Sequence, residues 1–567
     1  MGVQVSSGRD ETAPREVPER DVLTIHMKDY FQGAPLCDRV PRRYWPRLES
    51  RIEQTTAEVL DQLDRHDHKA TFFVLGWTAD LVPDIVAEVA RRGHEVASMG
   101  YHHYATQRMS PDEFRQDIAR SKRALERASG RAVLGYRTPY GWLSKRQRWA
   151  FDILADEGFA YDSSICPVGF GHWNSKHLVP FQHDVQSGQL WELPICSQSL
   201  FGFRLPISGG NYLRQLPEPL FHRYVERWRA RRKQPWMLYF TLWEIDPNQP
   251  RFDVLPRIEK LRQYRNLDVM SARIANFLEQ HKFGTAADYL NLVPSPVTAT
   301  EPVAVSASIK TQDNVALETV DRLPVTIVVP CYNEEGGLGF LANTLDSFAA
   351  DHEKTLDVSY VLVDDGSTDA TAERMSEIFG RRTNTRIVRH EANRGVAAAM
   401  MTGIKAATTD IVAVIDSDCS YDPAHLGAMI PLIADGADAV TVSPYHRDGA
   451  VMNVPGWRLV LSRGLSALYR RALKTKLATY TACVRVYRRS AVADINLRNN
   501  GFLGVAEIVA VLDARSKRIV EVPAVLEARL IGHSKMKIMR TIAGHLRLLF
   551  ELAVLQRHRS KRDVPGQ

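Results

Sequence analysis

Cysteines are scarce and widely spaced in this 567-residue sequence. The six of them form no CxxC pair and no metal-finger spacing, so neither a disulfide framework nor a zinc finger is expected. Isolated cysteines of this kind are typical of a reducing compartment. The residues are Cys37, Cys166, Cys196, Cys331, Cys419 and Cys483.

Long apolar runs are also missing. No segment approaches ~18 uninterrupted apolar residues, and residues 1–20 lack the apolar core of a signal peptide. We therefore expect a cytoplasmic protein without a spanning helix. Residues 541–562 form an amphipathic pattern with a basic end, which either docks peripherally on the inner face of an anionic membrane or packs on its own domain.

The length predicts two domains, because 567 residues are too many for one hydrophobic core. The formal net charge of +7 favours an anionic ligand or surface, and no nucleic-acid partner is expected. A stretch poor in aromatic residues and rich in Pro, Ala, Ser and Thr predicts the linker. We predict a disordered N-terminus (1–20), a first domain (21–292), a linker (293–321), a second domain (322–550) and a basic tail (551–567).

Both halves show the pattern of α/β domains, with short apolar strands that alternate with amphipathic helices. The strands of each half are expected to be largely parallel, so functional residues should lie at their carboxyl ends. In the first half the clearest strands are 70–76 and 236–244, and in the second half 325–330 is followed by YVLVDDG and IVAVIDSD.

Acidic residues follow two strands of the second half. Asp364 and Asp365 end one strand and precede Gly366, where carboxylates can hold the base and ribose hydroxyls of a nucleoside. Asp416 and Asp418 are two residues apart just beyond a buried strand, and such a pair can bind Mg²⁺ or Mn²⁺ while diphosphate oxygens complete the shell. A helix cap is the other explanation for acids at such positions, and Asp369 suits that role.

These motifs resemble those of family-2 glycosyltransferases of the GT-A fold, above all the polyprenyl-phosphate sugar transferases. The resemblance covers about residues 323–550 and includes PCYNEE, VDDGSTD, DSDCSYDP and GHSK. It implies an inverting transferase with a UDP- or GDP-linked sugar donor, metal ligands Asp416 and Asp418, and catalytic residues Glu507 and Asp418. The resemblance also implies that the donor is bound by Pro330, Tyr332, Glu334, Asp364, Asp365, Asp416, Arg529, Ser534 and Lys535.

Glu507 bears on the acceptor. A hydroxyl acceptor needs a general base, whereas a phosphate acceptor is already ionised and needs none; a plain helix-surface glutamate is the other interpretation. The sequence also departs from the family, because a Ser-Gly-Phe-Arg stretch in its acceptor region is replaced here by Ala482, Cys483, Val484 and Arg485. A polyprenyl phosphate, a glycan and a small metabolite all stay open as acceptors.

Residues 21–290 resemble a polysaccharide deacetylase, a distorted (β/α) barrel that uses a metal held by one Asp and two His. The motifs HKATFFVLG, GYRTP, YDSSICP and LWELP carry this resemblance. The catalytic positions are altered, since His26 and Lys28 replace acids, Met99 replaces a histidine ligand and Thr241 replaces the acid histidine. His103 and Arg137 are retained, and a different metal site made from His26, His102 and His103 is the alternative.

The sequence therefore predicts a metal-dependent glycosyltransferase with an inactive deacetylase-like domain, which binds acceptor, shapes the transferase or mediates homo-oligomerisation. A bifunctional enzyme that acts on one amino sugar is the first rival. A non-catalytic carbohydrate-binding scaffold is the second rival, and the four retained acids Asp364, Asp365, Asp416 and Asp418 count against it.

Overall fold

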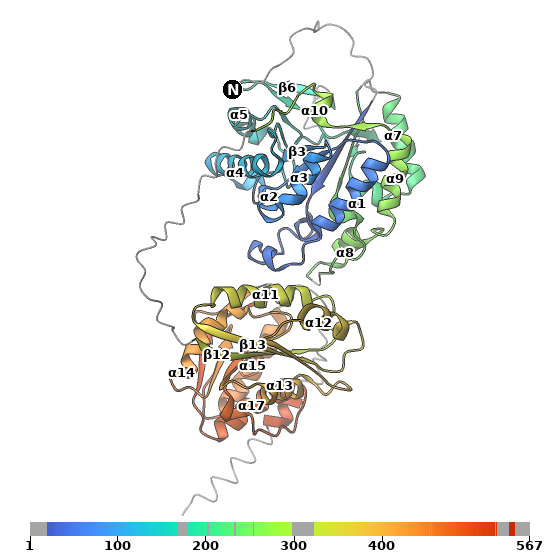
Figure 1. Cartoon of the computed structure of the whole chain (residues 1–567). Helices are drawn as coiled ribbons and strands as arrows, with labels where there is room; N and C mark the ends of the chain where they lie inside the picture. Colours follow the sequence, from blue (N-terminus) through green and yellow to red (C-terminus); the bar gives the residue numbers. More distant parts are fainter. Residues whose placement is uncertain are drawn as a thin grey trace, which may run out of the picture. The chain divides into compact units, whose positions relative to one another are not determined.

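The computed structural model divides into two compact units, and each is described by itself (Figure 1). The first comprises Met1–Val40, Ser50–Gln249 and Leu255–Thr311, and the second comprises Pro41–Glu49, Pro250–Val254 and Gln312–Gln567. The structure describes residues 20–167, 178–200, 203–231, 234–252, 254–297, 322–452, 454, 456–527, 529 and 544–549. Most of the predicted linker, the whole predicted tail, Ser534 and Lys535 lie outside these residues.

The first unit is built on a curled, mainly parallel sheet of nine strands, as expected for the deacetylase-like fold. In spatial order the strands are β10 (Met237–Thr241), β1 (Asp21–Met27), β2 (Thr71–Val74), β3 (Glu95–Ser98), β4 (Gly135–Tyr136), β5 (Tyr161–Asp162), β7 (Leu190–Glu192) and β6 (Phe181–His183), with β11 (Phe283–Gly284) beside β1. A separate hairpin joins β8 (Ser197–Leu200) to β9 (Phe203–Pro206).

Helices accompany this sheet in the alternating order that the sequence predicts (Figure 1). Helix α4, for example, buries an apolar stripe formed by Phe114, Ile118 and Leu125. The helices are α1 (Ile52–Arg65), α2 (Gly76–Leu81), α3 (Pro83–Arg91), α4 (Pro111–Ser129), α5 (Trp149–Asp156), α6 (Gly210–Gln215), α7 (Glu218–Arg229), α8 (Arg257–Tyr264), α9 (Met270–Gln280) and α10 (Ala286–Tyr289).

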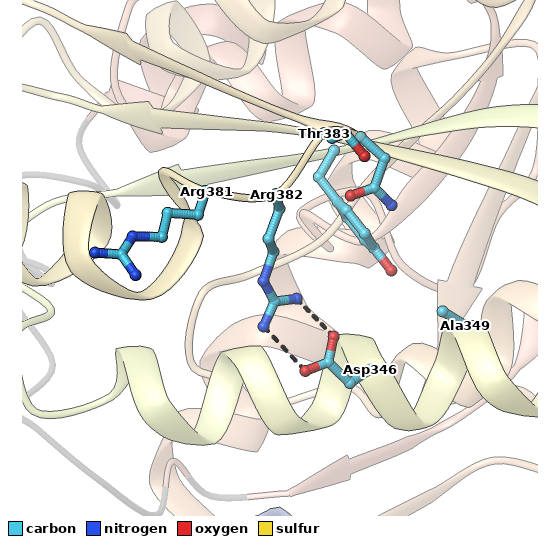
Figure 2. Close-up of a pocket in the computed structure, with 7 residues that line it drawn as sticks. Asp346, Ala349, Arg381, Arg382 and Thr383 are labelled. Carbon is cyan, nitrogen blue, oxygen red and sulfur yellow. Dashed lines mark hydrogen bonds and ion pairs between the residues drawn. The ribbon is translucent and has the colours of Figure 1, made fainter.

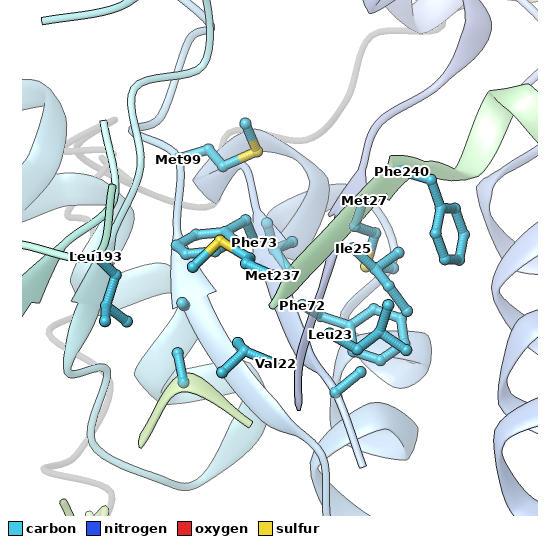
Figure 3. Packing of buried hydrophobic residues seen from close by; sticks show 14 of the residues in the cluster. Val22, Leu23, Ile25, Met27, Phe72, Phe73, Met99, Leu193, Met237 and Phe240 are labelled. Atoms are coloured by element: carbon cyan, nitrogen blue, oxygen red, sulfur yellow. The ribbon is translucent and has the colours of Figure 1, made fainter. Parts of the chain in front are cut away.

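Strand β1 lies at the centre of the core of the first unit. All seven of its residues are buried, because neighbouring strands flank it and apolar side chains cover both of its faces. Figure 3 shows Val22, Leu23, Ile25 and Met27 among side chains from β2 and β10, including Phe72. The residues just beyond this packed strand are thereby held in place.

The second unit has a sheet of seven strands, largely parallel as predicted, in which β18 is antiparallel to both of its neighbours. The spatial order is β14 (Thr385–Arg389), β13 (Leu356–Asp364), β12 (Leu323–Cys331), β15 (Ile411–Val414), β18 (Arg485–Arg488), β16 (Ala439–Ser443) and β19 (Ile519–Pro523). A smaller sheet pairs β17 (Ala450–Met452) with β20 (Val525–Glu527).

Helices cover both faces of this sheet, so its central strands are continuous apolar runs. Figure 1 shows α11 and α12 on one side and α13 and α17 on the other. The helices are α11 (Leu338–Asp351), α12 (Thr371–Phe379), α13 (Val396–Ala406), α14 (Leu426–Ala434), α15 (Gly456–Ala472), α16 (Arg489–Val492) and α17 (Phe502–Ala514). Within the described part of the chain, no helix has both the length and the apolar character that crossing a bilayer requires.

Candidate functional site

The loops that follow β12 and β13 are tied together by hydrogen bonds. The backbone N–H of Asn333 donates to Ser367 Oγ at 2.9 Å, and that of Thr368 donates to Asn333 Oδ1 at 2.7 Å. The N–H of Glu334 donates to Thr371 Oγ1 at 2.6 Å. These bonds fix the backbone that presents Glu334 at the carboxyl edge of the sheet.

Asp364 lies at the end of β13, where the chain turns sharply. The turn needs Gly366, because its φ is +68° and a Cβ there would lie 2.4 Å from the carbonyl carbon of Ala392. Asp364 is buried, accepts from the N–H of Ser367 at 3.0 Å and pairs with Arg389 at 3.1 Å. Its contact with a nucleoside stays a prediction.

Asp365 is also buried, and its carboxylate organises the backbone ahead of α13. It accepts from the N–H groups of Arg394 and Gly395 at 2.9 and 2.8 Å, and its Oδ1 lies 2.6 Å from His390 Nδ1. Both oxygens are therefore engaged within the chain. Asp365 therefore has a structural role in addition to its predicted contact with the donor.

Four charged residues meet beyond β12, β15 and β20. The Arg529 guanidinium forms an ion pair with Glu334 and lies 3.5 Å from Asp418 Oδ2. Asp418 Oδ1 accepts from the N–H and the hydroxyl of Ser420 at 2.9 and 2.7 Å. The structure thus brings together Glu334, Asp416, Asp418 and Arg529, which the sequence places far apart.

This carboxylate cluster is suited to a divalent cation. Burial raises the pKa of Asp416 to about 7, and the nearby charge of Asp418 adds to that rise. Arg529 offsets only part of the repulsion between the two acids, and their hard oxygen atoms are the ligands that Mg²⁺ and Mn²⁺ prefer. The residues present therefore fit the ion that the sequence predicts.

The stretch that departs from the family pattern touches this cluster. The thiol of Cys483 hydrogen-bonds to Asp416, and burial raises the pKa of that thiol. Arg485 is buried and donates to the carbonyls of Val505 and Tyr480 at 2.6 and 2.7 Å. Cys483, which the sequence analysis placed in the acceptor region, therefore lies beside Asp416, a contact that was not predicted, whereas Arg485 ties β18 to α17.

Glu507 is buried on α17 and does not lie on a helix surface. Its carboxylate accepts from the N–H groups of Arg498 and Asn499 at 2.9 and 3.0 Å and from the Asn499 amide at 2.8 Å. These bonds hold the loop that leads into α17. The role of general base stays a prediction.

We expect Glu507→Ala to lower the free energy of unfolding by about 1 kcal/mol, because it removes the acceptor of three part-buried hydrogen bonds from the 498–499 loop. Glu507→Gln keeps one acceptor oxygen and should retain turnover within about tenfold with a phosphate acceptor, which needs no base. Thermal unfolding and initial rates check both. A folded Glu507→Gln protein with turnover reduced 10²-fold or more would instead show a base.

A pocket of about 410 Å³ is lined by residues of α11, of β13 and of the loop before β14 (Figure 2). Two of its lining residues, Arg382 and Asp346, form an ion pair with N–O distances of 2.5 and 3.0 Å. None of the predicted site residues lines it. Its lining residues are Asp346, Ala349, Tyr360, Arg381, Arg382, Thr383 and Asn384.

In the first unit, the altered deacetylase positions gather at the carboxyl end of β1. His26 pairs in register with Thr241 of β10 and stacks on Tyr239 with ring centroids 5.3 Å apart. Arg137 is fully buried and bonds to His26 Nε2 at 3.0 Å and to Thr24 Oγ1 at 2.8 Å. Burial lowers the pKa of His26, and the positive charge of Arg137 lowers it further.

Lys28 follows β1 and is buried with its Nζ 2.5 Å from the carbonyl of Pro139. Burial lowers the pKa of this amine to about 7. The neighbouring Asp29 does not pair with Lys28. Its carboxylate accepts hydrogen bonds from the Ser50 hydroxyl at 2.6 Å and from the Arg51 N–H at 3.0 Å. A lysine side chain thus occupies the place where the family resemblance implies an acid near the metal.

Met99 and His103 are the two remaining residues of the deacetylase-like site that the sequence analysis named. Met99 is buried in the core of the unit (Figure 3), where its side chain packs as an apolar residue. His103 is buried and adopts a positive φ of 59°. The positive charges of Lys28 and His103 further depress the pKa of His26, so the surroundings oppose a dication in this place.

We expect Lys28→Met to raise the free energy of unfolding by about 2 kcal/mol below pH 7, because it removes a buried cation. The unfolded amine has a pKa near ~10.4, while the folded one has a pKa of about 7. The cost of burying the charge is therefore largest below pH 7 and fades as the pH rises toward ~10.4. Thermal unfolding of both proteins at pH 6 and pH 9 tests this, and an equal gain at both values would contradict it.

A cluster of three possible metal ligands lies on β5, β6 and β7. Ligand atoms of Asp162, His183 and Glu192 lie within 4.8 Å of one another, close enough to surround one ion. Burial raises the pKa of Glu192 to about 8, and His183 Nε2 lies 2.9 Å from Glu192 Oε2. Asp162 and Glu192 stand in the motifs YDSSICP and LWELP, but no sequence spacing connects them to His183.

Comparisons with known proteins show which families the two halves of the chain resemble. The model of glycosyl transferase family 2 matches residues 326–495. A dodecaprenyl-phosphate galacturonate synthase of Rhizobium johnstonii is 30% identical over 236 residues, which are 41% of this chain and 67% of that protein. The chain belongs to glycosyl transferase family 2. A dolichol-phosphate mannosyltransferase of Pyrococcus furiosus is 29% identical over 236 residues, covering 41% of this chain and 64% of that protein.

The first half of the chain is similar to polysaccharide deacetylases. The polysaccharide deacetylase model matches residues 44–154, and a domain of unknown function, DUF3473, matches residues 163–291. A peptidoglycan-N-acetylglucosamine deacetylase of Bacillus cereus is 38% identical over 96 residues, covering 17% of this chain and 35% of that protein. The chain thus spans little more than a third of the length of that deacetylase.

Proposed function

We propose that the protein transfers a sugar from a nucleotide-sugar donor to a polyprenyl phosphate in a metal-dependent, inverting reaction. The observation that carries the proposal is the cluster of Asp416, Asp418, Glu334 and Arg529 at the carboxyl edge of the second sheet. The similar proteins from Rhizobium johnstonii and Pyrococcus furiosus, named for dodecaprenyl and dolichol phosphates, favour this class of acceptor.

In the proposed reaction, an ionised oxygen of the acceptor phosphate attacks the anomeric carbon from the face opposite the diphosphate. The bond from that carbon to the diphosphate oxygen breaks, and the nucleoside diphosphate leaves with the electron pair. A divalent ion held by Asp416 and Asp418 would neutralise part of the charge that develops there. Arg529, fixed by Glu334, adds a positive charge beside the same leaving group.

A screen of nucleoside diphosphates tests the donor part of this proposal. A ligand raises the melting temperature in proportion to the logarithm of its concentration over its dissociation constant. We expect UDP or GDP to stabilise the protein in the presence of Mn²⁺, and to do so much less in EDTA. No stabilisation by any nucleoside diphosphate with Mn²⁺ or Mg²⁺ would overturn the proposal.

We also propose that the deacetylase domain of this chain does not deacetylate. His26 stands where the family has an aspartate as general base, and the nitrogen groups of Lys28 and Arg137 are buried nearby. These nitrogen groups disfavour a metal ion at this position. A domain kept without its chemistry retains its surface and shape, which suits it to bind acceptor, support the transferase or mediate oligomerisation.

A further inference from the structure

Helix α15 presents an unusual apolar face to the outside of the second unit. Trp457, Val460, Leu461 and Leu468 are 51%, 71%, 42% and 40% exposed. Their spacing of three, four and seven residues places them on one face of the helix. Tyr469, in contrast, is fully buried in the unit's core. The helix is therefore packed on one side while large apolar side chains project from another.

The charges of α15 are of one sign. Its sequence, GWRLVLSRGLSALYRRA, holds Arg458, Arg463, Arg470 and Arg471 and no acidic residue. Arg458 lies over the ring of Trp457 with its guanidinium carbon 5.4 Å from the ring centroid, and Arg463 lies 5.0 Å from that of Tyr445. An apolar stripe bordered by cations matches the interface of a bilayer that carries anionic headgroups.

A second copy of the chain fits this face less well. Two copies that met through the same face would bring two sets of arginines together with no acid on the helix to offset them. A bilayer instead offers hydrocarbon to the apolar residues and phosphates to the guanidinium groups. The charge pattern thus favours a lipid surface as the occupant.

We propose that α15 docks the protein on an anionic membrane surface, with Trp457, Val460, Leu461 and Leu468 entering the interfacial layer and the arginines binding headgroup phosphates. The inference rests on the proposed function, because a polyprenyl phosphate lies in a bilayer with its charged end at the surface. Beyond α15 the chain continues to Cys483, which contacts Asp416. The proposed docking helix is thus followed in sequence by a residue that contacts the carboxylate cluster.

Vesicle co-sedimentation of the full-length protein tests the proposal. We expect binding to vesicles of phosphatidylcholine with 30% phosphatidylglycerol, little binding to pure phosphatidylcholine, and weaker binding in high salt because screening reduces the attraction. The double variant Val460→Glu/Leu461→Glu should bind anionic vesicles at least about tenfold more weakly, since it removes apolar contact and adds repulsion. Because Val460 and Leu461 are exposed, the double variant should keep the melting temperature of the unmodified protein, and that measurement checks that it is folded.

Ile258→Glu is the matched control, because Ile258 is 83% exposed on α8 of the other unit; it should bind like the unmodified protein. Normal vesicle binding by the double variant would overturn the proposal, as would equal loss in the control. Absence of binding by the unmodified protein would also overturn it. A dimer of the unmodified protein that the double variant converts to monomer, without vesicle binding, would identify a self-association surface instead.

Transfer assays separate this inference from the proposed function. With a short, water-soluble isoprenyl phosphate and no vesicles, the double variant should match the unmodified protein. With a long polyprenyl phosphate in anionic vesicles, its kcat/KM should fall by at least about tenfold, in line with its weaker partition. If the unmodified protein binds vesicles but transfers to neither acceptor, the proposed function fails while the docking inference stands.

Discussion

Asp418→Ala should reduce sugar transfer by on the order of 10²-fold or more, because it removes a ligand of the metal that stabilises the leaving diphosphate. The side chain lies beyond the end of β15 and pairs with Ser420 and Arg529, so its removal leaves the hydrophobic core intact. Initial rates over a Mn²⁺ titration, together with the melting temperature, measure both effects.

Asp410→Ala provides the control for that variant. Asp410 precedes the same strand and forms a largely exposed ion pair with Arg488 at 3.1 Å, which contributes little to stability. Its rate should stay close to that of the unmodified protein. Near-normal turnover of Asp418→Ala at saturating Mn²⁺ would show that Asp418 is not a ligand of the catalytic metal.

The second large effect concerns the deacetylase domain. His26→Asp alone should release no acetate from N-acetylated saccharides, because Lys28 still repels a dication, Met99 supplies no imidazole ligand and Thr241 is a poor general acid. The combined change of His26→Asp, Lys28→Glu, Met99→His and Thr241→His restores all four groups. Only that protein is expected to bind zinc and to release acetate.

Metal content and acetate release are measured on the same preparations. The variant that carries Lys28→Glu, Met99→His and Thr241→His but keeps His26 is the matched control, since it can regain the metal without the base. Acetate release by the unmodified protein would contradict the proposal of an inactive domain. Zinc binding by the single His26→Asp variant would contradict the part assigned to Lys28.

The strands that lead to the carboxylate cluster could be predicted because their patterns are local. Continuous apolar runs indicated β12, β13 and β15, and parallel strands end at a common edge, which predicted the meeting of acids from different strands. The close approach of Asp418 and Arg529 was expected from the family resemblance alone, because Arg529 follows β20 of the smaller sheet.

Other contacts depend on pairings that no local pattern encodes. Cys483 reaches Asp416 because the antiparallel strand β18 lies beside β15, although the two are well separated in sequence. The partners of Glu507 could not be predicted, because they are backbone N–H groups of the loop at 498–499 and no pattern of apolar residues indicates that contact. The burial of Lys28 could not be predicted either, because a lysine that follows a strand is ordinarily exposed.

The bonds between the loops after β12 and β13 have a consequence for the thermodynamics of donor binding. Asn333 and Glu334 are already held by Ser367, Thr368 and Thr371, so the conformational entropy of these loops is lost when the chain folds. Little further ordering is then required when a nucleotide arrives. Calorimetry of nucleoside diphosphate binding should accordingly show a heat-capacity change no larger than the contact surface explains, without the excess that accompanies folding of a loop on its ligand.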